Sequence, residues 1–174
     1  MTDEIVSTMG RIFTVRLGPS DDLFLAIQDI VRRHDIRAGV VLSITGACTK
    51  AIVQKFIDGQ QSIGVVEFDG PMEVSGHGIV GWVRAPDRGA EPFGVGRYID
   101  GEPYVHVHLT ITSSKTTLCG HLMEGCIVRS RHDHSHFTTM VAEVEGAALE
   151  MRLDSELEAK GKGFGVYHEL VPLN

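Results

Sequence analysis

Three histidines lie close together in one stretch of the chain. The stretch from Tyr104 to Cys126 reads YVHVHLTITSSKTTLCGHLMEGC and contains His106, His108 and His121. Its first part alternates β-branched or aromatic residues with other residues, which is typical of a β-strand. Because successive side chains of a strand point to opposite faces, we expect His106 and His108 on the same face.

A polar turn at Ser113-Ser114 predicts that His121 joins this face. The residues after the turn form a returning strand, and a two-residue loop places His121 opposite His106. Moving the loop by one step, at the same even length, keeps all three histidines on one face. An odd loop length or a bulge at Gly120 would instead send His121 to the other face.

Three imidazoles on one sheet face predict a transition-metal site, and Zn²⁺ suits them best. Zinc takes imidazole nitrogens at about 2.0–2.1 Å and leaves a fourth position open when the protein supplies three ligands. We therefore predict His106, His108 and His121 as ligands of Zn²⁺ or another divalent transition metal. The alternative is a solvated or hydrogen-bonded histidine cluster without an ion.

A carboxylate near the predicted site, Glu124, is the candidate catalytic residue. Three neutral ligands leave the charge of the ion undiminished, so a bound water can ionise near a pH of about 7. Glu124 lies three residues after His121 and could transfer a proton there. It is an equally good candidate for a structural carboxylate that fixes the turn before Gly125. Glu102 and Tyr104 are weaker alternatives.

Other histidines lie outside this stretch. His77 falls in GHGIVG, which has the glycine spacing of a dinucleotide-binding loop, but proline and glycine follow it instead of a helix. We therefore expect a glycine-rich strand and a structural role for His77. In RSRHDHSH, the residues His132, His134 and His136 are spaced two apart, so a strand here would place them on one face. A polar loop explains them as well as a second metal site does.

The composition favours one globular domain and argues against several kinds of partner. The 174 residues include 16 basic and 23 acidic ones, a net charge of −7, which argues against an extended phosphate-neutralising surface but is compatible with a local basic patch. No apolar run reaches the roughly 20 residues of a membrane helix, and the acidic start MTDEIVSTMG is no secretory signal. We expect a cytoplasmic protein without a membrane partner, whose Cys48, Cys119 and Cys126 are buried thiols. Residues 1–174 are predicted to form a single domain, with its core at about 11–153 and a C-terminal tail at 154–174.

The elements around the histidines predict an α+β fold. Arg11–Leu17 is predicted as a strand, and Ser20 as the N-cap of an amphipathic helix over Asp21–His34. Further strands are predicted at residues 36–44, 49–57, 65–68 and 72–83 and, as a pair, within 138–153, with a break at Thr45-Gly46-Ala47. One main helix after the first strand, followed by many strands, predicts two layers with a mostly antiparallel sheet.

Three separated blocks resemble the plants-and-prokaryotes conserved (PPC) domain family, in the order in which that family has them. They are LGPSDDLFLAIQDIVRRHDIRAGVVLSITGA, VEFDGPMEVSGHG and HVHLTITSSKTTLCGHLMEGCIV. The third looks like the family's most recognisable block, a strand with HxH, a turn, then Gly-His-Leu and Glu-Gly-Cys. The resemblance covers roughly Arg11–Val128 and, more loosely, Thr138–Leu153.

The resemblance implies a βαβ-type start feeding an antiparallel sheet, a fold similar to that of the zinc enzyme acetolactate decarboxylase, and assembly as a homotrimer. In prokaryotic members, the positions of His106, His108 and His121 are associated with a bound metal, with zinc as the expected ion. Plant members carry an AT-hook that contacts DNA. This chain has no Arg-Gly-Arg-Pro element and resembles the stand-alone prokaryotic type, so direct DNA contact is not expected.

Three hypotheses about function follow. The first is a trimeric zinc-binding protein whose open three-histidine site serves a small molecule or a partner. The second is a metal-dependent lyase or hydrolase related to acetolactate decarboxylase. The third is a DNA-associated regulatory protein, in keeping with the DNA-binding label of the family. The sequence does not decide between an enzyme and a binding protein, because a fold alone does not establish function.

Overall fold

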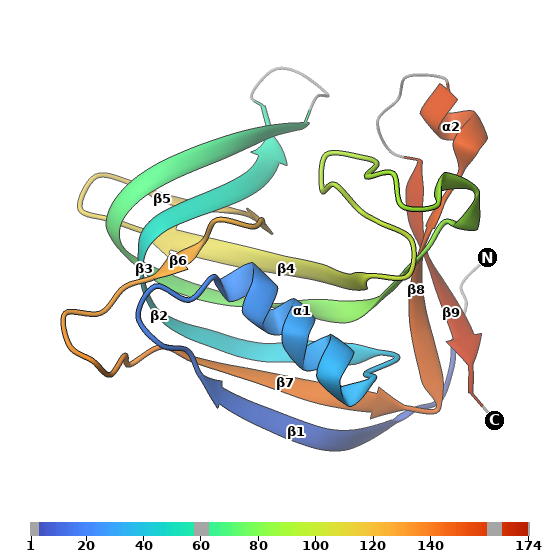
Figure 1. The fold of residues 1–174 in the computed structure, drawn as a ribbon, viewed down its shortest axis with the longest axis horizontal. Coiled ribbons are helices and arrows are strands. Elements are labelled where there is room, and N and C mark those ends of the chain that lie inside the picture. Colours follow the sequence, from blue (N-terminus) through green and yellow to red (C-terminus); the bar gives the residue numbers. More distant parts are fainter. Residues whose placement is uncertain (1–3, 58–62, 160–164, 174) are drawn as a thin grey trace.

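The computed structural model describes residues 4–57, 63–159 and 165–173, and one helix of it packs on a curved, mostly antiparallel sheet (Figure 1). The helical elements are α1 (Leu23–His34), the 3₁₀ turn η1 (Pro86–Arg88) and α2 (Ser155–Ala159). The strands are β1 (Thr8–Arg16), β2 (Gly39–Phe56), β3 (Ile63–Arg84), β4 (Pro103–Thr112), β5 (Thr117–Leu122), β6 (Ile127–Val128), β7 (Thr138–Glu145), β8 (Ala147–Leu153) and β9 (Val166–Pro172). The predicted α+β class is confirmed. No helix within the described ranges is long and apolar enough to cross a membrane.

The sheet closes on itself at the strands that carry the histidines. The strand order is β1-β7-β2-β5-β4-β3-β8-β9, and β2 also pairs with β3. As a result β2, β3, β4 and β5 form a ring in which each strand pairs with two others of the ring. Register shifts along β2, one of them between Cys48 and Lys50, mark β-bulges, and bulges bend a strand. In Figure 1 the far ends of β2 and β3 curl away from the horizontal strands.

The predicted break at Thr45-Gly46-Ala47 is wrong, because β2 runs through it without interruption. Gly46 is needed there because a Cβ on this residue would overlap the ring of Phe137. The two strands predicted at 65–68 and 72–83 are likewise parts of the single strand β3. The predicted pair within 138–153 is present as β7 and β8. These two strands pair with different partners, β7 with β1 and β2, and β8 with β3 and β9.

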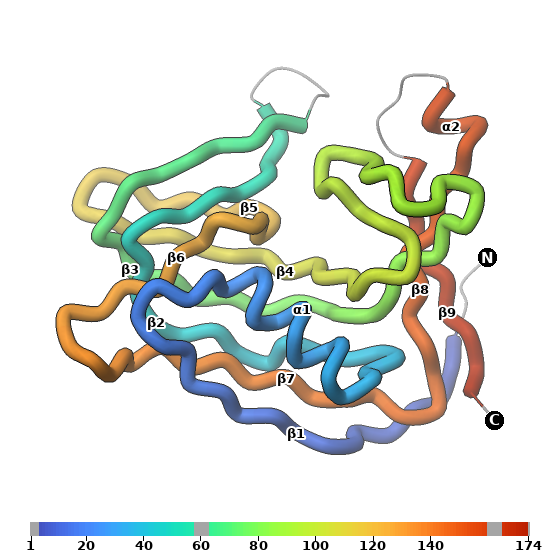
Figure 2. The backbone as a smooth tube through the Cα atoms, in the orientation of Figure 1, coloured from blue at the N-terminus to red at the C-terminus, as the bar shows by residue number. Residues whose placement is uncertain are grey.

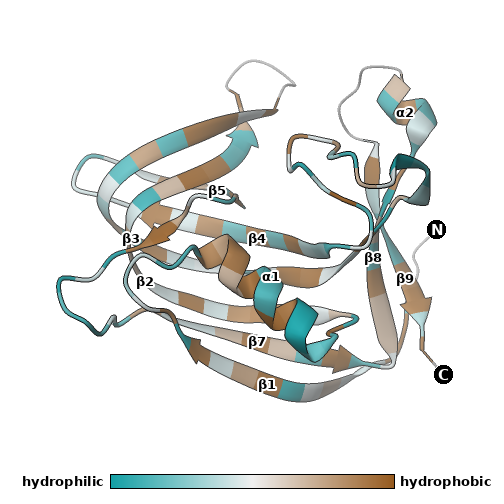
Figure 3. Cartoon of the chain, in the orientation of Figure 1, coloured by the Kyte–Doolittle hydropathy of each residue, from teal (hydrophilic) through white to brown (hydrophobic). Residues whose placement is uncertain are grey.

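The main core lies between α1 and one face of the sheet. Four apolar residues of α1 are at most 1% exposed and pack in one cluster with alternate residues of β4: Leu23, Ile27, Ile30 and Val31 with Val105, Val107, Leu109 and Ile111. In Figure 3 the first turns of α1 are brown and its last turn, which holds Arg32, Arg33 and His34, is teal. Because side chains alternate along β4, its histidines lie on the face away from α1.

The helix begins two residues later than predicted, because its N-cap is Asp22 and not Ser20. Oδ1 of Asp22 accepts hydrogen bonds from the backbone N–H of Phe24 (2.8 Å) and Leu25 (3.2 Å). Ser20 has a φ of 70°, outside the extended region that an N-cap occupies. Oδ2 of Asp22 accepts from the N–H of Gly125 at 2.7 Å. One carboxylate therefore joins the start of α1 to the turn that follows β5.

A second, smaller core covers one end of the histidine-bearing face. Tyr104 of β4 and Ile79 of β3 pack there against Leu149 and Met151 of β8. The segment expected as a C-terminal tail contributes to this region, since its strand β9 pairs along the whole of β8. In Figure 1, β8 and β9 stand upright at the end of the molecule where β3 finishes.

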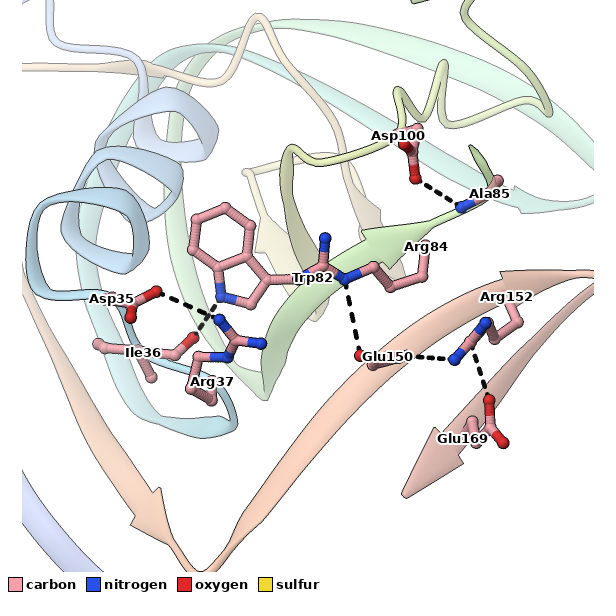
Figure 4. Close-up of polar contacts among 10 residues, drawn as sticks. All are labelled: Asp35, Ile36, Arg37, Trp82, Arg84, Ala85, Asp100, Glu150, Arg152 and Glu169. Carbon is pink, nitrogen blue, oxygen red and sulfur yellow. Dashed lines mark hydrogen bonds and ion pairs between the residues drawn. The ribbon is translucent and has the colours of Figure 1, made fainter. Parts of the chain in front are cut away.

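Ion pairs fix the β8–β9 pair at the end of β3 (Figure 4). Glu150 of β8 pairs with Arg84 of β3 at 3.6 Å and with its neighbour Arg152 at 2.6 Å, and Arg152 pairs with Glu169 of β9 at 2.8 Å. Next to them, Nε1 of Trp82 donates to the backbone oxygen of Ile36 at 2.8 Å. The ion pairs tie the two C-terminal strands to the central sheet, and the Trp82 hydrogen bond ties β3 to the connection between α1 and β2.

The long connection between β3 and β4 folds back against the same strands (Figure 2). Ala85 and Phe93 of this connection belong to the second core, and Arg88 forms an ion pair with Glu158 of α2. The N–H of Ala85 donates to Oδ1 of Asp100 at 2.7 Å, which closes the base of the connection (Figure 4). The second core is thus enclosed by segments from three parts of the chain.

We predict that Asp22 contributes strongly to stability. Replacing it with alanine removes the helix cap and the link to Gly125, and should lower the free energy of unfolding by about 2 kcal/mol or more. Asp22→Asn should cost less, because its amide oxygen still caps the helix while its NH₂ group cannot accept from Gly125. Urea denaturation measures both, with Asp29→Ala as the control, since Asp29 forms only an exposed ion pair with Arg33. Equal losses for Asp22→Ala and Asp29→Ala would contradict the proposed link.

Candidate metal centre

His106, His108 and His121 lie on one face of the β4–β5 hairpin, as predicted, but the turn lies one residue further along the chain than expected. His108 pairs with His121 in the β4–β5 register, where a turn at Ser113-Ser114 would have placed His121 opposite His106. The N–H of Ser113 donates to the backbone oxygen of Thr116 at 2.9 Å, so the turn is centred on Ser114 and Lys115. Because the step moves the register by two residues, all three histidines stay on the same face.

The three imidazoles converge. Nε2 of His106 lies 3.3 Å from Nε2 of His121, and one ring nitrogen of each of the three residues lies within 4.8 Å of the others. The ring centroid of His108 is 5.4 Å from that of His106 and 4.7 Å from that of His121. In a tetrahedral zinc site with bonds of 2.0–2.1 Å, neighbouring ligand atoms are about 3.3–3.4 Å apart. The separation of the two Nε2 atoms therefore fits two ligands of one ion.

Partial burial favours the neutral form of two of these rings, those of His106 and His121. It lowers the pKa of His106 to about 4, with further lowering by the nearby His121, His168 and His108. The pKa of His121 is lowered as well, first by burial and then by His108. A metal binds the neutral imidazole, so a lowered pKa makes the lone pairs available at neutral pH.

One ring atom of the site has no partner. Nδ1 of His106 is buried and makes no hydrogen bond within the described residues. A histidine that binds a metal through one nitrogen usually donates its other N–H to a carboxylate, a carbonyl oxygen or water. In this respect the site departs from a complete zinc site, while the donor types and the spacing fit one.

A fourth histidine, which the sequence did not assign to the site, lies beside His106. Nε2 of His168 is 2.9 Å from the phenol oxygen of Tyr104, and the ring of His168 is centred 5.5 Å from that of His106. Burial raises the pKa of Tyr104 and lowers that of His168. The alternation in Val166–Leu170 places His168 on the face of Met151, but only the β8–β9 pairing brings it to the site.

A cavity of about 380 Å³ adjoins two of the three histidines. It is lined by Gln54, Lys55, Phe56, Ile63, His108, Cys119, Gly120 and His121. The residues from β2 and β3 reach this position because β2 pairs with β5 through Val53 and Gln54. The cavity offers a small molecule an apolar wall, one amide and one ammonium group next to the imidazoles.

Two other residues on this face stay outside the converging group. His77 pairs with His108 across β3 and β4 and is exposed. Cys119 lies two residues before His121 and is also exposed, so the expectation that it is buried is wrong. Cys48 and Cys126 are buried as predicted.

The carboxylates considered for catalysis lie elsewhere. Glu124 is exposed in the turn after β5 and lines a different cavity, together with Asp22 and Phe24 on the side of α1. Glu102 lines that cavity too and forms an ion pair with Arg32. It is Asp22 whose carboxylate binds the N–H of Gly125. A catalytic role for Glu124 stays a prediction, and its position gives that role no support.

The second histidine group does not converge in the same way. His132, His134 and His136 are exposed in the connection between β6 and β7. Across the described residues, the three β4–β5 histidines are the group whose ligand atoms come close enough to share an ion.

Comparisons with solved structures agree with this fold. A metal-containing protein from Archaeoglobus fulgidus superposes with a TM-score of 0.69 at 19% identity, covering 99% of this chain and 100% of that chain. A plant- and prokaryote-conserved (PPC) protein from Pyrococcus horikoshii gives 0.64 at 19% identity, covering 86% and 90%. Acetolactate decarboxylase from Bacillus subtilis gives 0.41 at 10% identity, covering 76% and 52%, which is too low to support an argument.

The sequence itself identifies the family. No curated protein sequence matches the chain. The model of the Plants and Prokaryotes Conserved (PCC) domain, in contrast, matches residues 5–131. This span contains the hairpin with His106, His108 and His121. Since the match covers well over half of the chain, the protein belongs to the Plants and Prokaryotes Conserved (PCC) domain family.

Proposed function

We propose that this protein binds one zinc ion through His106, His108 and His121 and uses the remaining coordination position for a small molecule or a partner group. The observation that carries the proposal is the 3.3 Å separation of two Nε2 atoms in a group of three converging imidazoles. The lowered pKa values of His106 and His121 support it, because they favour the neutral form that a metal requires. A relative described as metal-containing has the same fold.

The residues around the triad would position what binds there. A bound zinc ion supplies a Lewis acid and lowers the pKa of a water ligand to about 7. His108 is exposed and His121 half-buried, so access to the ion is from the side of the 380 Å³ cavity. Its apolar wall excludes water from part of the ligand, while Lys55 and Gln54 provide polar contacts.

A metal-dependent lyase or hydrolase is the second candidate function. It is favoured by the contact between Tyr104 and His168 beside His106, because this pair can hold a proton next to the metal centre. A panel of simple esters and 2-hydroxy-3-keto acids tests it. Turnover that is lost in His168→Phe with zinc retained would support an enzyme, and absence of turnover across the panel would count against one.

We also propose that the chain assembles as a homotrimer. Large apolar side chains are exposed along the first strand of the sheet, where Met9 is 60% and Ile12 50% exposed, and β1 ends the strand order. An unpaired sheet edge with exposed apolar residues favours burial against another copy. Sedimentation equilibrium should give three times the 19.0 kDa of one chain, or about 57 kDa. A mass of one or two chains would contradict the trimer and leave the metal site untouched.

We predict that zinc content depends on each member of the triad. Alanine at His106, His108 or His121 should weaken zinc binding by more than the roughly 10–100-fold that follows when a hydrogen-bond partner of a ligand is lost, because here the ligand itself is lost. Elemental analysis after dialysis against buffered free zinc measures the effect. His77→Ala is the matched control, since His77 shares the face and pairs with His108 without joining the group.

Two results would contradict this assignment. One is wild-type protein, purified without chelators, that holds less than a tenth of an equivalent of any transition metal. The other is a loss of zinc in His77→Ala as large as in the triad variants.

The metal-free protein should lose stability as the pH falls from 6.5 to about 4. Burial lowers the pKa of His106 from 6.5 to about 4. Between these two pH values the imidazole is protonated in the unfolded chain and neutral in the folded chain. The free energy of unfolding then decreases by at most about 1.4 kcal/mol per pH unit for this residue. Denaturation of chelator-treated protein measures the slope. His106→Phe should flatten it and His77→Ala should not; identical slopes for wild type and His106→Phe would refute the assignment.

A further inference from the structure

A second cavity, of about 650 Å³, lies on the same sheet face at the other end of β4. Its floor includes the hydroxyl-bearing residues Thr45, Ser75, Thr110 and Thr112, which come from β2, β3 and β4. Its wall is the connection between β6 and β7, which Figure 3 shows in teal as strongly hydrophilic. None of the three converging histidines lines it, so it is distinct from the candidate metal centre.

The lining of the cavity has a net positive charge. Arg129 and Arg131 both line it, and Glu73 is the one carboxylate in the lining. Neither arginine takes part in any ion pair found among the described residues. The chain as a whole has more acidic than basic residues, 23 against 16. Arg129 is half-buried, and its backbone N–H donates to the oxygen of Ala47 at 2.8 Å, which holds it against β2.

The wall of the cavity is held in place by its own hydrogen bonds. Oγ of Ser130 lies 2.9 Å from the backbone oxygen of His132 and 2.8 Å from that of His134. Ser135 is buried, donates to the backbone oxygen of Leu17 and accepts from the N–H of Phe137 at 3.3 Å. The side chains that line the cavity therefore project from a fixed backbone, which lowers the cost of ordering them on binding.

We propose that this cavity binds a small polyanion, a ligand with phosphate or several carboxylate groups, through Arg129 and Arg131. Guanidinium groups bind phosphate and carboxylate oxygens in a two-pronged manner, and hydroxyls add neutral hydrogen bonds. The imidazoles of His132, His134 and His136 line the same space and can donate further hydrogen bonds. Glu73 opposes the anion and limits its affinity. The proposal does not depend on the metal centre.

Isothermal titration of the zinc-treated protein of 174 residues with inorganic phosphate and with citrate, in a low-salt chloride buffer, tests the proposal. We expect saturable binding of at least one of the two, and the tighter one distinguishes a phosphate ligand from a polycarboxylate. Arg129→Gln and Arg131→Gln should each weaken binding by about tenfold or more, since each removes charge-assisted hydrogen bonds. Glu73→Gln should tighten it. Arg33→Gln is the matched control, because it removes the same charge from α1 on the opposite side of the sheet.

Four outcomes would overturn the proposal. The first is no saturable binding of either anion, and the second is equal weakening by Arg33→Gln, which would indicate a general charge effect. The third is loss of binding when zinc is removed with a chelator, which would place the anion on the ion. The fourth is tight binding of a short DNA duplex without binding of phosphate or citrate, which would make this a nucleic-acid surface. Thermal unfolding of each variant checks that it folds. If Arg129→Gln does not fold, Arg131→Gln still tests the proposal, because Arg131 is exposed.

Discussion

The alternation of side chains along β4 is the constraint on which the rest of the structure depends. Val105, Val107, Leu109 and Ile111 pack under α1, and this packing leaves His106 and His108 only the opposite face. A slip of one residue would bury two imidazoles in the apolar core and expose four apolar side chains. The hydrophobic core thus fixes which way the histidines point.

The third histidine depends on a different set of contacts. His121 is brought opposite His108 by the turn at Ser113–Thr116, and its strand is held from the other side by the pairing of Val53 and Gln54 with β5. Asp22 then links the end of this strand to the start of α1. The ring of four strands and the helix cap therefore act together on one short strand, and this keeps a pair of nitrogens 3.3 Å apart where a free hairpin would fray.

The shared face of the histidines was predictable from the sequence because moving the turn by one step, at the same even loop length, leaves all three on that face. The turn is centred one residue further along the chain than predicted, because Oγ of Ser113 accepts hydrogen bonds from the N–H groups of Lys115 and Thr116. The sequence alone does not distinguish between these two turn positions. Contacts between segments that are distant in the chain could not be predicted from the sequence. Gly46 was predicted to belong to a strand break. Its contact with Phe137, which explains the glycine, could not be seen because Phe137 lies far along the chain. His168 was missed because β9 reaches the site only through β8. Glu124 was favoured by its proximity in sequence to His121, but it lines a different cavity.

The burial of the histidine-bearing face is graded, and the grading matches what a metal centre needs. At one end the second core covers Tyr104 and partly covers His106, which keeps that imidazole neutral. His108, two residues further along, is exposed, and beyond it Thr110 and Thr112 open into the cavity with Arg129. A fully buried triad would be neutral but closed, and a fully exposed one would be open but protonated more readily. Since each step of two residues along β4 moves about 7 Å, the imidazoles and the arginines occupy neighbouring parts of one surface, and a ligand at either site meets the same rigid strand.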